Sequence, residues 1–311
     1  MPSNSRRWSD LAYGLATVIF FGLYTPLAKR WLATMPPLLS TGFLYTSSGA
    51  TLALLVAVRW LAGYRIEPVR RLELRDARIY GLGVACGVSA SWLQLDGLGQ
   101  VSGTVGSLLS NLEGVFMVAI ALFFGESLRL SEAVGAAAIL GGAVVLSLGA
   151  SGGPATHLAG VVMVAIAYLG WASDNMTTQR LADRDPMALM ATKCLLAGAV
   201  SLGLAWLAHE PLPPVAQIVP ALLVGGIWWS GATAIFVLGL RALGGAKMGS
   251  LLFLTPFAGA VGSIVGLKEP VTMAVVVAAA LMGVGALALG HGHIKAENSD
   301  PAAAPTRSPT G

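Results

Sequence analysis

The stretch from Trp171 to Asn175 reads Trp-Ala-Ser-Asp-Asn and is followed, beyond a charged turn at Arg180 to Pro186, by Lys193. It places an acid, Asp174, and a base, Lys193, inside otherwise apolar segments, where a charge is costly in free energy. Each lies about ten residues from the middle of the turn. Two antiparallel helices would therefore bring them to one depth, and we predict a helical hairpin in which they pair.

The composition of the whole chain indicates that it is embedded in a lipid membrane. Of 311 residues, 55% are hydrophobic, 11% are charged and 39 are glycine, as expected of an integral membrane protein. The formal net charge of +4 could suggest nucleic acid. The basic residues fall at segment ends, however, where the positive-inside rule explains them, so we expect no nucleic-acid partner.

The cysteines and histidines predict neither a disulfide framework nor a metal site. Cys86 and Cys194 both lie inside apolar stretches, and the four histidines share no ligand spacing with them. No sequence pattern implies a cofactor.

Ten segments have the roughly 20 mostly apolar residues that a membrane-spanning helix needs. The fold class that they predict is all-α integral membrane. The first follows Arg6 and Arg7 but has no clear cleavage site, so we interpret it as a retained helix. The segments are Leu11 to Leu32, Leu38 to Leu61, Ile79 to Leu98, Ser102 to Phe124, Leu130 to Leu148, Leu158 to Gln179, Met187 to Ala208, Val215 to Leu240, Ala246 to Leu267 and Val271 to Leu289.

The distribution of Lys and Arg supports ten crossings independently of hydropathy. With both termini on one side, that side collects fifteen of the 19 basic residues, and this bias predicts cytoplasmic termini. Besides Lys193, the opposite side has only three: Lys29, Arg30 and Lys268. The fifteen are Arg6, Arg7, Arg59, Arg65, Arg70, Arg71, Arg75, Arg78, Arg129, Arg180, Arg184, Arg241, Lys247, Lys295 and Arg307.

The two halves of the chain repeat. Gly106-Ser-Leu-Leu109 recurs as Gly249-Ser-Leu-Leu252, and the same shift of 143 places Glu126 on Glu269. Because each half holds five helices, an odd number, the second copy must enter the membrane from the opposite side. Inverted repeats of this kind place a transporter's substrate site near the midplane, where the halves meet.

We therefore divide the chain into three parts. Residues 1–150 form the first five-helix repeat and residues 151–290 the second. Residues 291–311 are rich in Ala, Pro, Ser and Thr and are predicted to be a disordered cytoplasmic tail.

Three motifs resemble a known family. They are Asn111-Leu-Glu-Gly-Val-Phe116 in the fourth segment, Leu254-Thr-Pro-Phe257 in the ninth, and Trp171-Ala-Ser-Asp-Asn-Met-Thr177. From about Leu11 to Leu289 the chain looks like an EamA-type member of the drug/metabolite transporter superfamily. The resemblance implies ten helices in two inverted five-helix repeats, a bacterial inner-membrane location, and proton-linked or facilitated movement of small metabolites, commonly outward.

Two residues depart from that family pattern. The Trp-Gly often seen in the first helix is Phe21-Gly22, and the proline expected after Glu113 is Gly114. We expect the second change to leave the fourth helix without the kink that Pro256 gives the ninth.

Glu113 lies about midway along the fourth segment, and an ionisable residue at the bilayer centre is a candidate functional group. A charged carboxylate is disfavoured there, so Glu113 could take up and release a proton near neutral pH. Alternatively, Glu113 and Asn111 hydrogen-bond a neighbouring helix and serve only packing.

Asp174, Asn175 and Lys193 could line a substrate cavity and bind an amino or carboxyl group. Alternatively, Asp174 and Lys193 form a static buried ion pair that fixes how the sixth and seventh helices pack. The charge count places this pair in the inner half of the membrane, below the level of Glu113. That separation favours the pair as an anchor or gate and Glu113 as the coupling group.

Aromatic residues on the helices that the resemblance places around a cavity could stack on a solute or attract an ammonium group. They are Trp92, Trp171, Trp228, Trp229, Tyr24, Tyr45 and Phe257. Trp171 and Trp92 lie deepest in their segments, and Tyr24 is a further candidate. The alternative is the interfacial belt in which membrane tryptophans often lie. Gln94 and Asp96 lie toward the outer end of the third segment and are expected to face water.

The leading hypothesis is a secondary transporter, an exporter of a small metabolite such as an amino acid or a related amphipathic solute, that works by alternating access. Its expected partners are the solute, the lipid bilayer and, if transport is proton-coupled, protons; the oligomeric state is open. A membrane-embedded enzyme is the alternative, but no His-Glu-x-x-His motif or activated nucleophile supports it. A non-transporting receptor would need a long loop or an appended domain.

Overall fold

The computed structural model describes residues 4–33, 35–63, 74–125, 129–149, 158–181 and 185–299, and every regular secondary-structure element within these ranges is a helix. The helices are α1 (Asn4–Trp31), α2 (Pro37–Leu61), α3 (Leu74–Gln100), α4 (Gly103–Leu109), α5 (Leu112–Phe123), α6 (Leu130–Gly149), α7 (Leu158–Gln179), α8 (Pro186–Leu207), α9 (Val215–Leu223), the π-helix η2 (Val224–Trp229), α10 (Ser230–Leu243), α11 (Gly245–Leu252), α12 (Thr255–Gly266) and α13 (Met273–Ser299).

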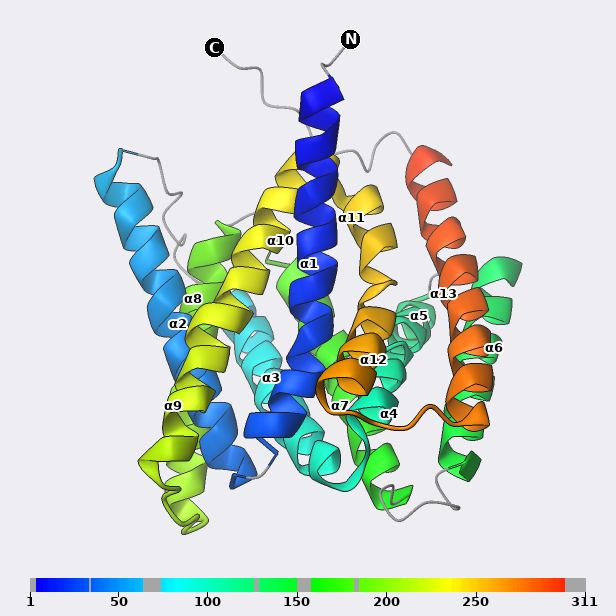
Figure 1. The fold of residues 1–311 in the computed structure, drawn as a ribbon. Coiled ribbons are helices and arrows are strands. Elements are labelled where there is room, and N and C mark those ends of the chain that lie inside the picture. The colour runs from blue at the N-terminus through cyan, green and yellow to red at the C-terminus, as the bar shows by residue number, and fades with distance from the viewer. Residues whose placement is uncertain are drawn as a thin grey trace.

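By their order and bounds these helices make ten crossings, which run between the two ends of the molecule (Figure 1). Helices α4 and α5 together form the fourth crossing, α9, η2 and α10 the eighth, and α11 and α12 the ninth. Eight of the ten are long and apolar enough to span a membrane. The other two are α3, which is 27 residues long, and the α11–α12 crossing. The all-α class and the ten predicted crossings are confirmed.

The packing of the helices is symmetric between the two halves. If each crossing is replaced by its counterpart in the other repeat, the same helix pairs result. Helix α2 lies against α8, α6 against α13 and α4 against α12, which are the second, fifth and fourth crossings with their repeat counterparts. The third crossing, α3, packs on the sixth, α7, and their repeat counterparts, the eighth crossing (α10) and the first (α1), pack on each other in the same way. In Figure 1, α1 begins and α13 ends at the upper end of the molecule. The architecture of two inverted repeats is confirmed.

The fourth crossing breaks in the middle, which corrects the expectation that a crossing without proline would stay unkinked. Between α4 and α5 the amide of Asn111 bonds to the carbonyl of Leu108 at 3.2 Å, one residue short of an α-helical bond. The side chain of Asn111 bonds to the same carbonyl at 2.9 Å, and that of Ser110 bonds to the carbonyl of Ser107 at 2.7 Å. Side chains that capture backbone carbonyls therefore break this helix, as Pro256 does in the ninth crossing.

Carboxylates from other parts of the chain cap two helix N-termini at the lower end of the molecule. Glu269 accepts bonds from the backbone amides of Gly103 and Thr104 at 2.6 and 2.7 Å, and Glu210 accepts one from Leu39 at 2.8 Å. The positive end of the helix dipole favours an anion there. Glu269 therefore acts at a helix end, whereas its repeat counterpart Glu126 lies outside the described residues.

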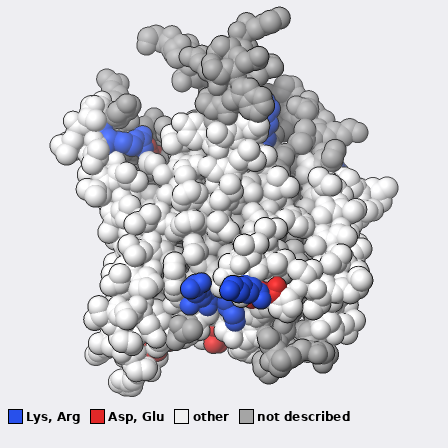
Figure 2. Space-filling view, in the orientation of Figure 1, with Lys and Arg blue, Asp and Glu red and all other residues white. Residues whose placement is uncertain are grey.

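The surface is suited to lipid. Lys and Arg side chains appear near the two ends in Figure 2, and a broad band between them shows none. Large apolar side chains such as Trp60, Phe123 and Leu207 are exposed by 66%, 86% and 65%. At the carboxyl end, α13 continues to Ser299, past the predicted start of the tail, and residues 300–311 lie outside the described ranges.

Candidate functional site

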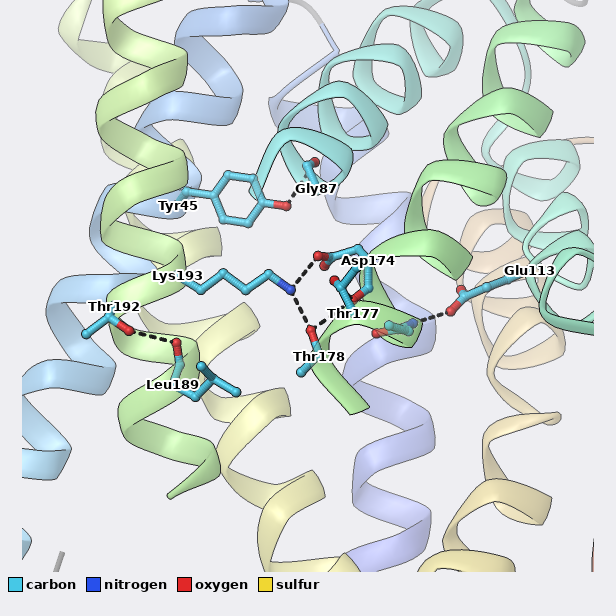
Figure 3. Close-up of polar contacts among 10 residues, drawn as sticks. Tyr45, Gly87, Glu113, Asp174, Thr177, Thr178, Leu189, Thr192 and Lys193 are labelled. Atoms are coloured by element: carbon cyan, nitrogen blue, oxygen red, sulfur yellow. Dashed lines mark hydrogen bonds and ion pairs between the residues drawn. The ribbon is translucent and has the colours of Figure 1, made fainter. Parts of the chain in front are cut away.

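Asp174 of α7 and Lys193 of α8 form an ion pair at the centre of the candidate site (Figure 3). Both residues are buried, with exposed fractions of 5% and 7%. The ammonium of Lys193 also donates to the hydroxyl of Thr178 at 2.6 Å. The pairing predicted from the hairpin is confirmed, and each charge makes the burial of the other tolerable.

Gly83 of α3 allows that helix to lie directly against the pair, and Gly87 takes part through its backbone. A Cβ atom at Gly83 would come within 2.5 Å of the Thr177 hydroxyl and 3.1 Å of a carboxylate oxygen of Asp174. The backbone carbonyl of Gly87 accepts a hydrogen bond from the hydroxyl of Tyr45 at 3.2 Å. Helices of both repeats therefore enclose the acid–base pair, α2 and α3 from the first and α7 and α8 from the second.

A small cavity adjoins the ion pair. Its volume is about 20 Å³, which is room for about one water molecule. Its walls carry the two charges, the thiol of Cys194 and the aromatic rings of Tyr45, Trp171 and Trp229. An organic solute would not fit, so this arrangement is closed.

Glu113 lies beside the pair rather than at another depth. The side-chain amide of Asn175, the residue after Asp174, donates to the Glu113 carboxylate at 2.5 Å (Figure 3). Glu113 is half-buried and Asn175 is exposed. The expectation that Glu113 and the pair occupy separate depths is wrong, because the break in the fourth crossing places Glu113 in the first turn of α5, level with Asn175.

The remaining predicted site residues divide between the cavity and other positions. Tyr24 is buried and its ring lies 4.8 Å from that of Trp229, a cavity residue. Asn111 is buried at the helix break. Trp92 is 39% exposed and is not among the residues that line the cavity. The structure therefore brings Tyr24 to the site and leaves Trp92 outside it.

Gln94 was expected to face water, and this is wrong. It is 2% exposed, and its side-chain amide donates to the hydroxyl of Tyr168 at 3.0 Å. Helical periodicity could have revealed its position, because Gln94 follows Gly87 by seven residues and shares a face of α3 with the glycines that pack on α7.

Trp229, which was one of seven aromatic candidates but not one of the favoured ones, joins the aromatic residues of several helices. Its ring lies 5.7 Å from those of Trp171 and Phe21. Within the described part of the chain, its indole nitrogen is buried and has no hydrogen-bond partner. The signal in the sequence was the stretch Gly225-Gly-Ile-Trp-Trp229, in which two adjacent tryptophans closely follow a Gly-Gly pair.

Metal-binding chemistry has no basis among the described residues. Nowhere in that part of the chain do three His, Cys, Asp or Glu side chains gather as a ligand set. Cys86 and Cys194 are free thiols.

Comparison with known families accounts for this architecture. The model of the EamA-like transporter family matches residues 8–148 and again residues 158–290. The chain belongs to the EamA-like transporter family. Each match covers one five-helix repeat, and members of the family are membrane transporters of the drug/metabolite transporter superfamily.

Two relatives of this EamA protein support the same class. An uncharacterized transporter of Methanothermobacter thermautotrophicus is 26% identical over 281 residues, which are 85% of this chain and 81% of the relative. The uncharacterized transporter YvbV of Bacillus subtilis is 26% identical over 263 residues, covering 82% and 83%. A solved structure, titled only as a crystal structure of a protein, has a TM-score of 0.65 at 22% identity over 91% of this chain and 97% of its own, and shares the fold.

Proposed function

We propose that this EamA protein is a secondary transporter that exports a small metabolite, such as an amino acid or a related amphipathic solute, by alternating access and with proton coupling at Glu113. The observation that carries the proposal is the hydrogen bond between Glu113 and Asn175. It joins an ionisable group of the first repeat to a polar group of the second. In inverted-repeat transporters, substrate and coupling sites lie where the halves meet.

The Asp174–Lys193 pair serves as a gate in this scheme. Lys193 lines the central cavity and also a narrow crevice, bordered by Tyr80 and Leu189, toward the turn between α7 and α8. Its ammonium bonds to Asp174 and Thr178 across the seam between those helices. Parting α7 from α8 would connect the cavity to that end of the molecule, and a solute with an amino and a carboxyl group could replace the lost partners.

Protonation of Glu113 supplies the coupling. A carboxylate accepts a stronger hydrogen bond than a neutral acid does. Taking up a proton would therefore weaken the bond to Asn175 and loosen α5 from α7, and releasing the proton would restore it. Proton movement and the relative motion of the two repeats are linked in this way.

The location that we propose is the bacterial inner membrane, with both termini in the cytoplasm. The bias of Lys and Arg toward one side supports this orientation. Tags at either end should be digested by protease in inside-out vesicles and protected in intact spheroplasts. The reverse pattern would contradict the orientation.

Transport by purified protein in liposomes tests the main proposal. A panel of labelled amino acids and amphipathic metabolites is offered with and without a pH gradient, and the recovered solute is analysed chemically. Accumulation of an unmodified solute that follows the gradient supports the proposal. Movement that ignores the gradient would indicate a facilitator, and a chemically altered solute would favour the membrane enzyme.

A further inference from the structure

Two adjacent tryptophans of the eighth crossing differ in how their indole N–H groups are used. The nitrogen of Trp228 donates to the backbone carbonyl of Phe20 at 2.7 Å, and its ring stacks on that of Phe20 at 4.7 Å. The nitrogen of Trp229 is buried without a partner among the described residues, although its ring lines the central cavity. The N–H of Trp228 therefore bonds within the fold, whereas the N–H of Trp229 is free to bond to another group.

An available buried donor needs an explanation. Leaving a polar group buried and unbonded costs free energy, and such groups in native structures are few. Packing alone does not require the nitrogen of Trp229, because its neighbours Tyr24, Trp171 and Phe21 contact it as aromatic rings. A phenylalanine would provide an apolar ring there without the unsatisfied N–H.

The backbone around Trp229 has an unusual form. Residues Val224–Trp229 form the π-helix η2, whose wider turn shifts the phase of the helix and is often found at functional sites. The carbonyl of Gly225 accepts from the hydroxyl of Ser230 at 3.1 Å. After this turn both tryptophans contact α1, but only Trp229 also lines the cavity.

We propose that Trp229 is a substrate-binding residue whose indole N–H donates to an oxygen acceptor, a carboxylate or carbonyl, of the transported solute. The proposal rests on the proposed transport function and adds a requirement to it: the solute must carry such an oxygen beside an apolar group. Lys193, which lines the same cavity, provides the matching positive charge. The rings of Trp171 and Trp229 contact the apolar part.

The test compares Trp229→Phe with Trp228→Phe in liposomes. The probes are labelled L-amino acids, each paired with the amine that lacks its carboxylate, such as L-leucine with 3-methylbutylamine. We expect Trp229→Phe to raise the half-saturating concentration of the carboxylate-bearing solute by about tenfold or more, because a hydrogen bond to a charged group is lost. Trp228→Phe should keep the wild-type value, and neither change should affect the amine selectively.

A second variant separates binding from folding. Replacing Trp229 by 3-benzothienylalanine keeps the bicyclic shape and exchanges N–H for sulfur, so it should reproduce the loss of affinity at wild-type thermal stability. Wild-type affinity in this variant, or an equal loss for the amine, would overturn the role of Trp229. Failure of the wild-type protein to move any solute would instead contradict the transport proposal itself.

Discussion

The side-chain amide of Asn175 donates to the carboxylate of Glu113 at 2.5 Å and thereby joins the second repeat to the first. Asp174, the preceding residue on α7, is paired with Lys193 of α8. One turn of α7 therefore holds partners on two sides. Movement of this helix would disturb both contacts, which makes it the natural element to test.

Glu113→Gln should abolish the dependence of flux on the pH gradient while the protein still folds. Glutamine keeps the size and an acceptor oxygen for Asn175 but cannot exchange a proton. The measurement is solute flux in liposomes over a range of imposed pH gradients. Glu132→Gln, at the start of α6, is the control and should leave the response intact. An unchanged pH profile in Glu113→Gln would show that Glu113 is not the coupling group.

Asp174→Asn and Lys193→Met should each destabilise the protein by roughly 3–5 kcal/mol, because either change strands a buried charge. The variant with exchanged charges, Asp174→Lys with Lys193→Asp, should be more stable than either of these two substitutions alone, because the pair is restored. Thermal unfolding in detergent measures all of these variants. If the exchanged protein is no more stable than single variants that carry Asp174→Lys or Lys193→Asp alone, the pair does not stabilise the fold.

Gly83→Ala and Gly87→Ala form a matched pair on one face of α3. The added methyl group would approach the Thr177 hydroxyl within 2.5 Å at Gly83 but would meet Asp174 and Tyr45 at an ordinary 3.5 Å at Gly87. Overpacking of this kind typically costs about 1–3 kcal/mol, so Gly83→Ala should be the less stable by that amount. Equal melting temperatures would mean that α3 does not pack tightly on α7.

Glu269→Gln should lower stability by about 1–2 kcal/mol, because the N-terminus of α4 loses its anionic cap. The carboxylate now binds the amides of Gly103 and Thr104 and the Thr104 hydroxyl. Lys268→Gln, at the exposed neighbouring position, serves as the control and should change stability little. A loss of similar size in the control would mean that the joint, rather than the cap, is responsible.

Hydropathy and charge were enough to predict the architecture. The bilayer requires every spanning segment to be apolar and favours Lys and Arg on one side, so both patterns can be read from the sequence. The pairing of Asp174 with Lys193 was also predictable, because a short turn fixes the relative height of two antiparallel helices. These features depend on local spacing, which the sequence displays directly.

Contacts between distant segments were not predictable in the same way. The partner of Glu113 lies 62 positions away, and the break that sets its height comes from the side chains of Ser110 and Asn111 rather than from proline. The polar side chain of Gln94 predicted exposure to water, whereas its helical phase places it on the buried face of α3. The role of Trp229 depends on a π-turn, a backbone feature that hydrophobic periodicity does not show.

The rings of Trp171 and Trp229 lie 5.7 Å apart on the wall of the cavity, tilted by 36°. Aromatic rings fixed in such a pair contribute to near-ultraviolet circular dichroism, a signal that disappears when their packing is lost. If α7 moves away from α8 as proposed, Trp171 moves with it, and the ring pair becomes an intrinsic optical reporter of that motion. Adding a solute that parts α7 from α8 should weaken this signal without any label being attached.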